Sequence, residues 1–132
     1  MPICAATIAW SVLGAVVRHS GSGLACGTEL VLCQGALWPV GGPAELHMLH
    51  RLLGACAAAL CAAAGLAAWR LGPARSRAAA LAAPFLALAQ LGLGAWTVGS
   101  LIAVLPVSLH LGVAATLLAD ALAIGFLGGP VP

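Results

Sequence analysis

The sequence predicts an all-α fold, namely an integral membrane four-helix bundle formed by one domain over residues 1–132. The first observation is composition: 63% of the residues are hydrophobic and only 6% are charged, whereas a soluble domain usually carries roughly 25% charged residues. The second is that uncharged apolar stretches recur four times, with flanks that bring each towards the roughly 20 residues of a membrane span. The third is that glycine and proline separate these stretches, as expected for turns.

The expected helices cover residues about 2–20, 45–70, 78–101 and 106–127. The first helix continues past Arg18, because a long arginine side chain can reach the membrane interface from within a helix. Gly72 and Pro73 end the second helix, and Pro106 marks the turn before the fourth. A long glycine-rich loop joins the first two helices, and loops of such length in small domains are usually functional.

The arginine positions predict the topology. Arg70, Arg75 and Arg77 cluster in the short connection between the second and third helices, and arginine-rich short loops stay on the cytoplasmic side. Both termini are then cytoplasmic, and the long loop between helices 1 and 2 lies on the extracytoplasmic side of the cell membrane. Arg18 and Arg51 fall on the outer side, so their positions require another cause. Five arginines without a lysine and a net charge of +2 are too sparse for a nucleic-acid-binding surface.

Two histidines are candidate haem-iron ligands. His50 and His110 lie near the outer ends of the second and fourth helices, at similar depth. Bundles commonly hold cofactors between facing helices, and haem iron accepts histidine as an axial ligand. The alternative is that each is an interfacial polar residue. A faint repeat accompanies them, Leu-Gly-Ala at 13–15 and at 93–95, which chance and common ancestry explain equally well.

The cysteines fall into two groups. Cys26 and Cys33 lie in the outer loop, where an oxidising compartment favours a disulfide between them. A zinc site that combines them with His19 and His47 is the competing interpretation, but the Cys-x6-Cys spacing is wider than that of the usual structural zinc motif. The remaining three cysteines lie inside the expected spans and are predicted to be small packing residues: Cys4, Cys56 and Cys61.

Three charged residues in or beside the spans are further candidates. Arg18 and Arg51 lie at the level of the histidines and are candidates to bind an anionic group such as a haem propionate, with lipid headgroup contact as the alternative. Asp120 is the only acid inside an expected span, which makes it a functional candidate. It lies roughly 15 Å along the helix axis from His110, so we expect a role in helix packing or at the inner end of the helix.

The segment LGAVVRHSGSGLACGTELVLCQGALWP followed by LHMLHRLLG resembles the first half of haem A synthases, membrane enzymes that oxidise a methyl group of haem O to the formyl group of haem A. The later QLGLGAWTV and LPVSLHLGVAATLL resemble the third and fourth helices of the same half. The resemblance implies that His50 and His110 ligate haem, with haem b as cofactor or haem O and haem A as substrate and product. It also implies a redox-sensitive lid formed by the Cys26/Cys33 loop, and haem O synthase and an electron-transfer protein as partners.

The chain departs from this family in two respects. Family members resemble two fused four-helix halves and this chain has one, so a homodimer or higher homo-oligomer is predicted. Small residues could permit close contact between chains: Gly92, Gly94, Gly112, Ala114 and Ala115. The family commonly has Glu three residues before its first ligand, where this chain has His47. Because His47 and His50 share a helical face, His47 is a candidate catalytic proton relay. Glu45, the other catalytic candidate, is expected to serve mainly as a helix-start acid.

These observations lead to three hypotheses of different classes. The leading one is a half-length, haem A synthase-like oxidoreductase that acts as a homo-oligomer. The alternative is a non-catalytic haem b-binding or electron-transfer membrane protein with the same two histidine ligands. A third hypothesis is a transporter or structural membrane protein in which the two histidines are incidental.

Overall fold

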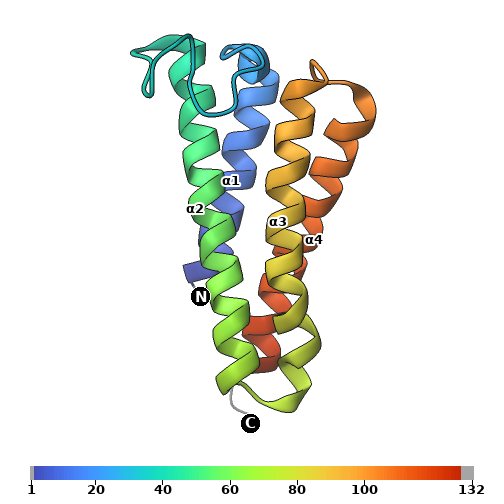
Figure 1. The fold of residues 1–132 in the computed structure, drawn as a ribbon. Helices are drawn as coiled ribbons and strands as arrows, with labels where there is room; N and C mark the ends of the chain where they lie inside the picture. The colour runs from blue at the N-terminus through green and yellow to red at the C-terminus, as the bar shows by residue number, and fades with distance from the viewer. Residues whose placement is uncertain (1, 129–132) are drawn as a thin grey trace.

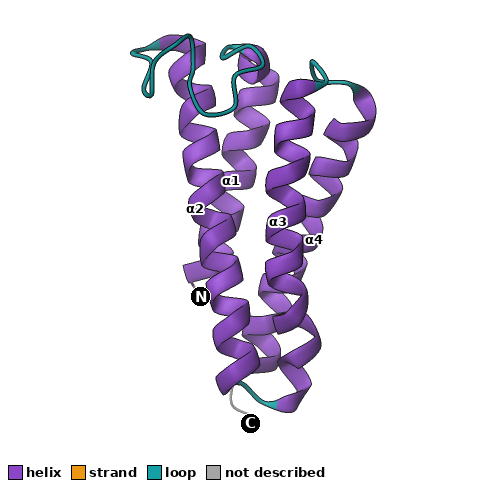
Figure 2. Ribbon diagram, viewed as in Figure 1, coloured by secondary structure: helices purple, strands orange, loops and turns teal. Residues whose placement is uncertain are grey.

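The computed structural model describes residues 2–128, which are helical apart from their connecting loops (Figure 1, Figure 2). The predicted four helices are confirmed as α1 (Pro2–His19), α2 (Gly42–Leu71), α3 (Arg77–Gly99) and α4 (Val104–Gly128), with short 3₁₀ turns η1 (Ser22–Leu24) and η2 (Ala74–Ser76). The segments Gly42–Leu71, Ala74–Gly99 and Val104–Gly128 are each long and apolar enough to cross a membrane, and α1 is a shorter apolar helix.

The helices follow one another around the bundle. α2 packs on α1 and α3, α3 packs on α4, and α4 closes the ring against α1, so α2 and α4 are diagonally opposite. Figure 1 shows the α1–α2 loop and the α3–α4 turn at the same end of the bundle, which we call the loop end. The η2 connection lies at the other end. α1 begins part-way along α2, so all four helices are present together mainly towards the loop end.

Small residues bring α2 and α3 close together. A Cβ atom added to Gly65 would lie only 2.6 Å from the Cβ of Ala83, so a larger residue at Gly65 would force the helices apart. Ala80, Ala83 and Ala87 of α3 are buried. Pro84 lies inside α3, where its lack of an N–H removes one helical hydrogen bond. Packing through glycine and alanine is typical of helices that associate in lipid.

The helix ends differ slightly from the expected ones for local reasons. α2 begins at Gly42 rather than near 45, because Pro43 fits the first helical turn and the Glu45 carboxylate accepts a hydrogen bond from the Gly41 N–H at 2.8 Å. α3 ends at Gly99, before the expected residue 101, since Leu101 adopts φ 55°. α4 begins at Val104 and holds a proline in its first turn, where no N–H is needed.

The outer surface of the bundle is apolar. Phe85 is 71% exposed and Phe126 is 83% exposed, and large apolar surfaces are unusual on soluble monomers. This outward orientation also corrects one expectation. Cys4 and Cys61 are buried as predicted, but Cys56 is exposed, because it lies on the side of α2 that faces away from the bundle. Its predicted packing role within the chain is therefore wrong.

Candidate functional site

The four helices line a half-open cavity of about 690 Å³ near the loop end. Small-molecule and cofactor sites commonly occupy roughly 300–1,000 Å³. Every helix contributes to its wall, and the connecting segments contribute Gly21, Gly23, Leu30 and Ile102. The cavity is therefore large enough for an organic cofactor and is bounded by the long loop.

His50 and His110 enter this cavity from the diagonally opposite helices α2 and α4. Each imidazole lies against a glycine of the preceding helix. A Cβ atom on Gly14 would lie 3.0 Å from Cε1 of His50, and one on Gly94 would lie 3.3 Å from Cε1 of His110. Absence of a side chain at these two glycines therefore makes room for both imidazoles, which are half-buried.

Trp10 contacts both histidines. Its indole is stacked on His50, with ring centroids 5.8 Å apart and 6° between planes, and meets His110 edge-on at 6.1 Å and 84°. The indole is buried against α2, since a Cβ atom on Gly54 would lie 2.6 Å from its Nε1 atom. Gly54 is one helical turn further from the loop end than His50, so Trp10 forms the inner end of the cavity. Sequence reasoning missed Trp10, although its four-residue spacing from Gly14 places both on one face of α1.

Gln90 is a second residue that sequence reasoning missed. Its side chain is 2% exposed, and its Nε2 atom lies 3.4 Å from Nε2 of His110. A ligand bound at that imidazole nitrogen would replace this contact. The available signal was the presence of a polar amide within a long apolar helix, since buried polar groups need a partner.

Polar atoms without partners concentrate at this cavity. Eight buried side-chain polar atoms within residues 2–128 have no hydrogen-bond partner, and all except the Oδ2 atom of Asp120 belong to residues that line the cavity. The seven atoms are Nε1 of Trp10, Nδ1 of His47, His50 and His110, Nη2 of Arg51, Oε1 of Gln90 and Oγ1 of Thr97. Because buried polar groups are normally paired, this concentration marks the cavity wall as the part of the described bundle where polar groups are least satisfied.

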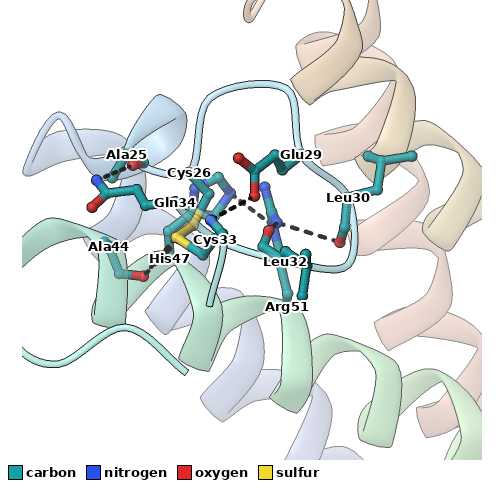
Figure 3. Close-up of a disulfide and its surroundings, with 11 residues drawn as sticks. Ala25, Cys26, Glu29, Leu30, Leu32, Cys33, Gln34, Ala44, His47 and Arg51 are labelled. Atoms are coloured by element: carbon teal, nitrogen blue, oxygen red, sulfur yellow. Dashed lines mark hydrogen bonds between the residues drawn. A yellow bond between two sulfur atoms is a disulfide. The ribbon is translucent and has the colours of Figure 1, made fainter. Parts of the chain in front are cut away.

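Arg51 lines the cavity and is hydrogen-bonded to the long loop, as the dashed lines in Figure 3 show. Its Nε donates a hydrogen bond to Nε2 of His47, and its Nη1 donates to the carbonyl oxygens of Leu30 and Leu32, all at 3.3 Å. Its Nη2 remains without a partner. Since Nε2 of His47 accepts a hydrogen bond, the proton of the neutral imidazole is assigned to Nδ1. His47 is thus a buried side chain with an unpaired donor.

The predicted disulfide between Cys26 and Cys33 is confirmed, with a Cα–Cα distance of 4.5 Å. Both sulfur atoms lie near the Ala44 carbonyl oxygen, at 3.7 and 3.8 Å, and pack with Met48 in a small apolar cluster. The short loop that the disulfide closes, residues 27–32, is the segment held by Arg51 (Figure 3). The disulfide therefore ties this loop to the start of α2, beside the cavity.

The remaining predicted site residues are more dispersed. Arg18 is exposed and lines the cavity. Glu45 binds the start of α2 and does not line the cavity. His19 also lies outside the lining, and within residues 2–128 no cluster of three or more His, Cys, Asp or Glu side chains is arranged to hold a metal ion. Asp120 lies beside a separate, narrow space in the other half of α4.

Two residues that were expected to face a second chain instead face inward. Gly94 and Ala114 line the cavity, because the side of α3 and α4 that carries them also carries His110 and its glycine contact. Their predicted role in contacts between chains stays a prediction. Gly92, Gly112 and Ala115 are exposed and remain available on the outer surface.

The lining as a whole combines imidazole and guanidinium groups with apolar side chains. Among the described residues that form it, none is acidic. Such a lining suits an anionic, mostly apolar organic ligand that can accept nitrogen donors. Comparison of the chain with protein-family models, curated proteins and solved structures found no match.

Proposed function

We propose that this protein is a membrane haem protein of the haem A synthase type, which holds haem between His50 and His110. The observation that carries the proposal is that these two imidazoles, from diagonally opposite helices, share one cavity and are each accommodated by a glycine. Haem iron accepts axial histidine. The cavity volume of about 690 Å³ fits a cofactor of this size class, and the guanidinium group of Arg51, which lines the cavity, offers a positive charge for a propionate.

In this proposal the bundle is a multi-pass protein of the cell membrane. The arginines around η2 favour a cytoplasmic position for that connection, which puts the loop end on the extracytoplasmic side. The Cys26–Cys33 disulfide supports this orientation, since disulfides persist in oxidising compartments. The haem then lies near the outer face, below the loop that Arg51 and the disulfide hold.

The reaction proposed is oxidation of the haem O methyl group to the formyl group of haem A, in which water supplies the formyl oxygen and four electrons and four protons pass to an external acceptor. Its support is the resemblance of the Cys26/Cys33 loop and the His50-Arg51 pair to haem A synthases. The haem group supplies the oxidative chemistry when bound. The chain supplies binding and orientation through His50 and His110. His47, held by Arg51, supplies a buried donor at the cavity wall that is suited to proton transfer.

A second candidate is a non-catalytic haem b-binding or electron-transfer protein. The position of Glu45 favours it, because its carboxylate is engaged by the Gly41 N–H and does not line the cavity. The resemblance to haem A synthases associates a carboxylate with the first ligand, and His47 occupies that position here. For the enzyme the proposed working unit is a homo-oligomer, because each chain offers one such cavity and the resemblance calls for two four-helix halves.

Haem extraction tests both candidates directly. The purified protein should contain haem, and mass spectrometry of the extract would show haem O or haem A for the enzyme and haem b alone for the second candidate. His50→Ala and His110→Ala should each abolish the low-spin absorption spectrum, because one axial ligand is lost. His19→Ala is the matched control, since His19 lies outside the cavity lining. An unchanged low-spin spectrum in His110→Ala would overturn the assigned ligand pair.

A further inference from the structure

The cavity has an approximate two-fold arrangement that relates the α1–α2 hairpin to the α3–α4 hairpin. In each hairpin the first helix supplies a glycine and the second supplies the histidine that lies against it, Gly14 with His50 and Gly94 with His110. Because the helices follow one another around the bundle, half a turn about its long axis takes α1 to α3 and α2 to α4.

The correspondence extends to the other residues of the wall. The shift in residue number that takes Gly14 to Gly94 also takes the other lining residues of α1 to lining residues of α3. The shift that takes His50 to His110 does the same for the lining residues of α2 and α4. The additional matched pairs are Trp10 and Gln90, Ser11 and Leu91, Val17 and Thr97, Arg18 and Val98, His47 and Val107, Arg51 and Leu111, and Gly54 and Ala114. The short Leu-Gly-Ala repeat is thus one part of a repeated cavity wall.

The two halves of the wall agree at the histidines and glycines but differ in polarity around them. The α1–α2 half has basic or imidazole side chains at three matched positions: Arg18, His47 and Arg51. The α3–α4 half has aliphatic side chains at the same positions: Val98, Val107 and Leu111. Half of the loop-end part of the cavity therefore carries the arginine side chains, and the other half carries the hydroxyls of Thr97 and Ser108 but no charged side chain.

We infer that this difference in polarity sets the orientation of a planar amphipathic ligand, with its carboxylate-bearing edge against Arg18 and Arg51 and its apolar edge against Val98 and Leu111. The inference rests on the proposed haem site. Two imidazoles related by a half-turn would accept a planar tetrapyrrole in either of two orientations. A carboxylate placed against Val98 and Leu111 would lie beside aliphatic side chains and lose the two guanidinium groups, which is unfavourable, so one orientation is selected.

Arg51 is suited to this orienting role by its own contacts. Two of its three nitrogens are occupied, Nε by His47 and Nη1 by the carbonyls of Leu30 and Leu32. Those bonds hold the planar guanidinium in place, while the buried Nη2 remains without a partner. A guanidinium that is held in place beside the cavity is well adapted to carboxylate recognition. Arg18 provides the second charge from α1.

The test compares ferric haem with its dimethyl ester, in which both propionates are neutral, by titration of purified protein in detergent. Wild type should bind haem about ten- to hundredfold more tightly than the ester, as expected for hydrogen bonds to charged groups. Arg51→Leu should remove most of this preference. Arg18→Leu, which leaves the loop contacts of Arg51 in place, should remove part of it. Arg70→Leu, in the last turn of α2 and outside the cavity, should keep the full preference.

A transfer variant tests the orientation itself. Combining Arg51→Leu with Leu111→Arg should restore the preference for haem and reverse its insertion, as read from the shifted ring-methyl resonances of low-spin ferric haem by NMR. If wild type binds haem and ester equally, both with a low-spin spectrum, the orientation proposal is overturned and the histidine site stands. If neither ligand gives a low-spin spectrum, the proposed function itself is overturned.

Discussion

Gly14, the glycine against which the His50 imidazole packs, should control haem affinity. In Gly14→Ala the new methyl carbon would lie 3.0 Å from Cε1 of His50 and 3.7 Å from both ring nitrogens. Carbon atoms pack best at about 3.5–4.0 Å, so the imidazole must retreat by about 0.5–1 Å. Trp10, stacked on the same ring and held against Gly54, restricts that movement.

The expected cost is that of an added methyl group in a packed interior, about 1–3 kcal/mol. If this free energy is lost from the ligation of haem by His50, haem affinity drops about 5- to 150-fold. Gly94→Ala should have a smaller effect, because its Cβ would lie 3.3 Å from His110 and a shift of a few tenths of an ångström suffices. Gly92→Ala is the matched control on the same helix, since a Cβ there would meet nothing within 4 Å.

The assay is titration of the purified protein with ferric haem, followed by the low-spin absorption bands. The predicted order of dissociation constants is Gly14→Ala above Gly94→Ala, with Gly92→Ala equal to wild type. Alanine also raises helix propensity by about 1 kcal/mol relative to glycine, so thermal stability need not follow the same order. Equal affinities for Gly14→Ala and Gly92→Ala would refute the argument that the absent side chain positions the imidazole.

Three further predictions concern the loop, the catalytic candidates and the assembly. Intact-mass measurement after alkylation should show two additional alkyl groups only when reductant is present. Replacing Cys26 and Cys33 by Ser should destabilise the closed loop by about 2–3 kcal/mol if the disulfide acts by restricting the unfolded chain. This loss should appear as faster proteolysis of residues 27–32. His47→Ala should retain haem but lose conversion of haem O, whereas Glu45→Ala should convert normally with slightly lower stability; the reverse pattern would return the acid role to Glu45. Native mass spectrometry should give at least two chains per particle, and a single-chain mass with persisting haem O oxidation would contradict the proposed assembly.

Features that depend on local chemistry could be predicted from the sequence. The four helices follow from apolar stretches bounded by Gly, Pro and Arg, because a helix satisfies its own backbone hydrogen bonds and needs only nearby residues. The Cys26–Cys33 disulfide joins residues separated by only 7 positions within one loop. The hydrogen bond from the Gly41 N–H to the Glu45 carboxylate is equally local. Each of these features involves residues that are close in sequence.

Features that depend on the rotation of one helix against another were decided by the tertiary structure. The contacts of the cavity join different helices: Trp10 with His50, Gln90 with His110, and Gly14 with His50. The helices have little amphipathic pattern, because apolar side chains also cover the outer surface of the bundle. The same uniformity made Cys56 resemble a packing residue, although it is exposed. In a water-soluble helix the polar face reveals the orientation. Here both faces are apolar, so only the packed bundle determines which residues meet at the cavity.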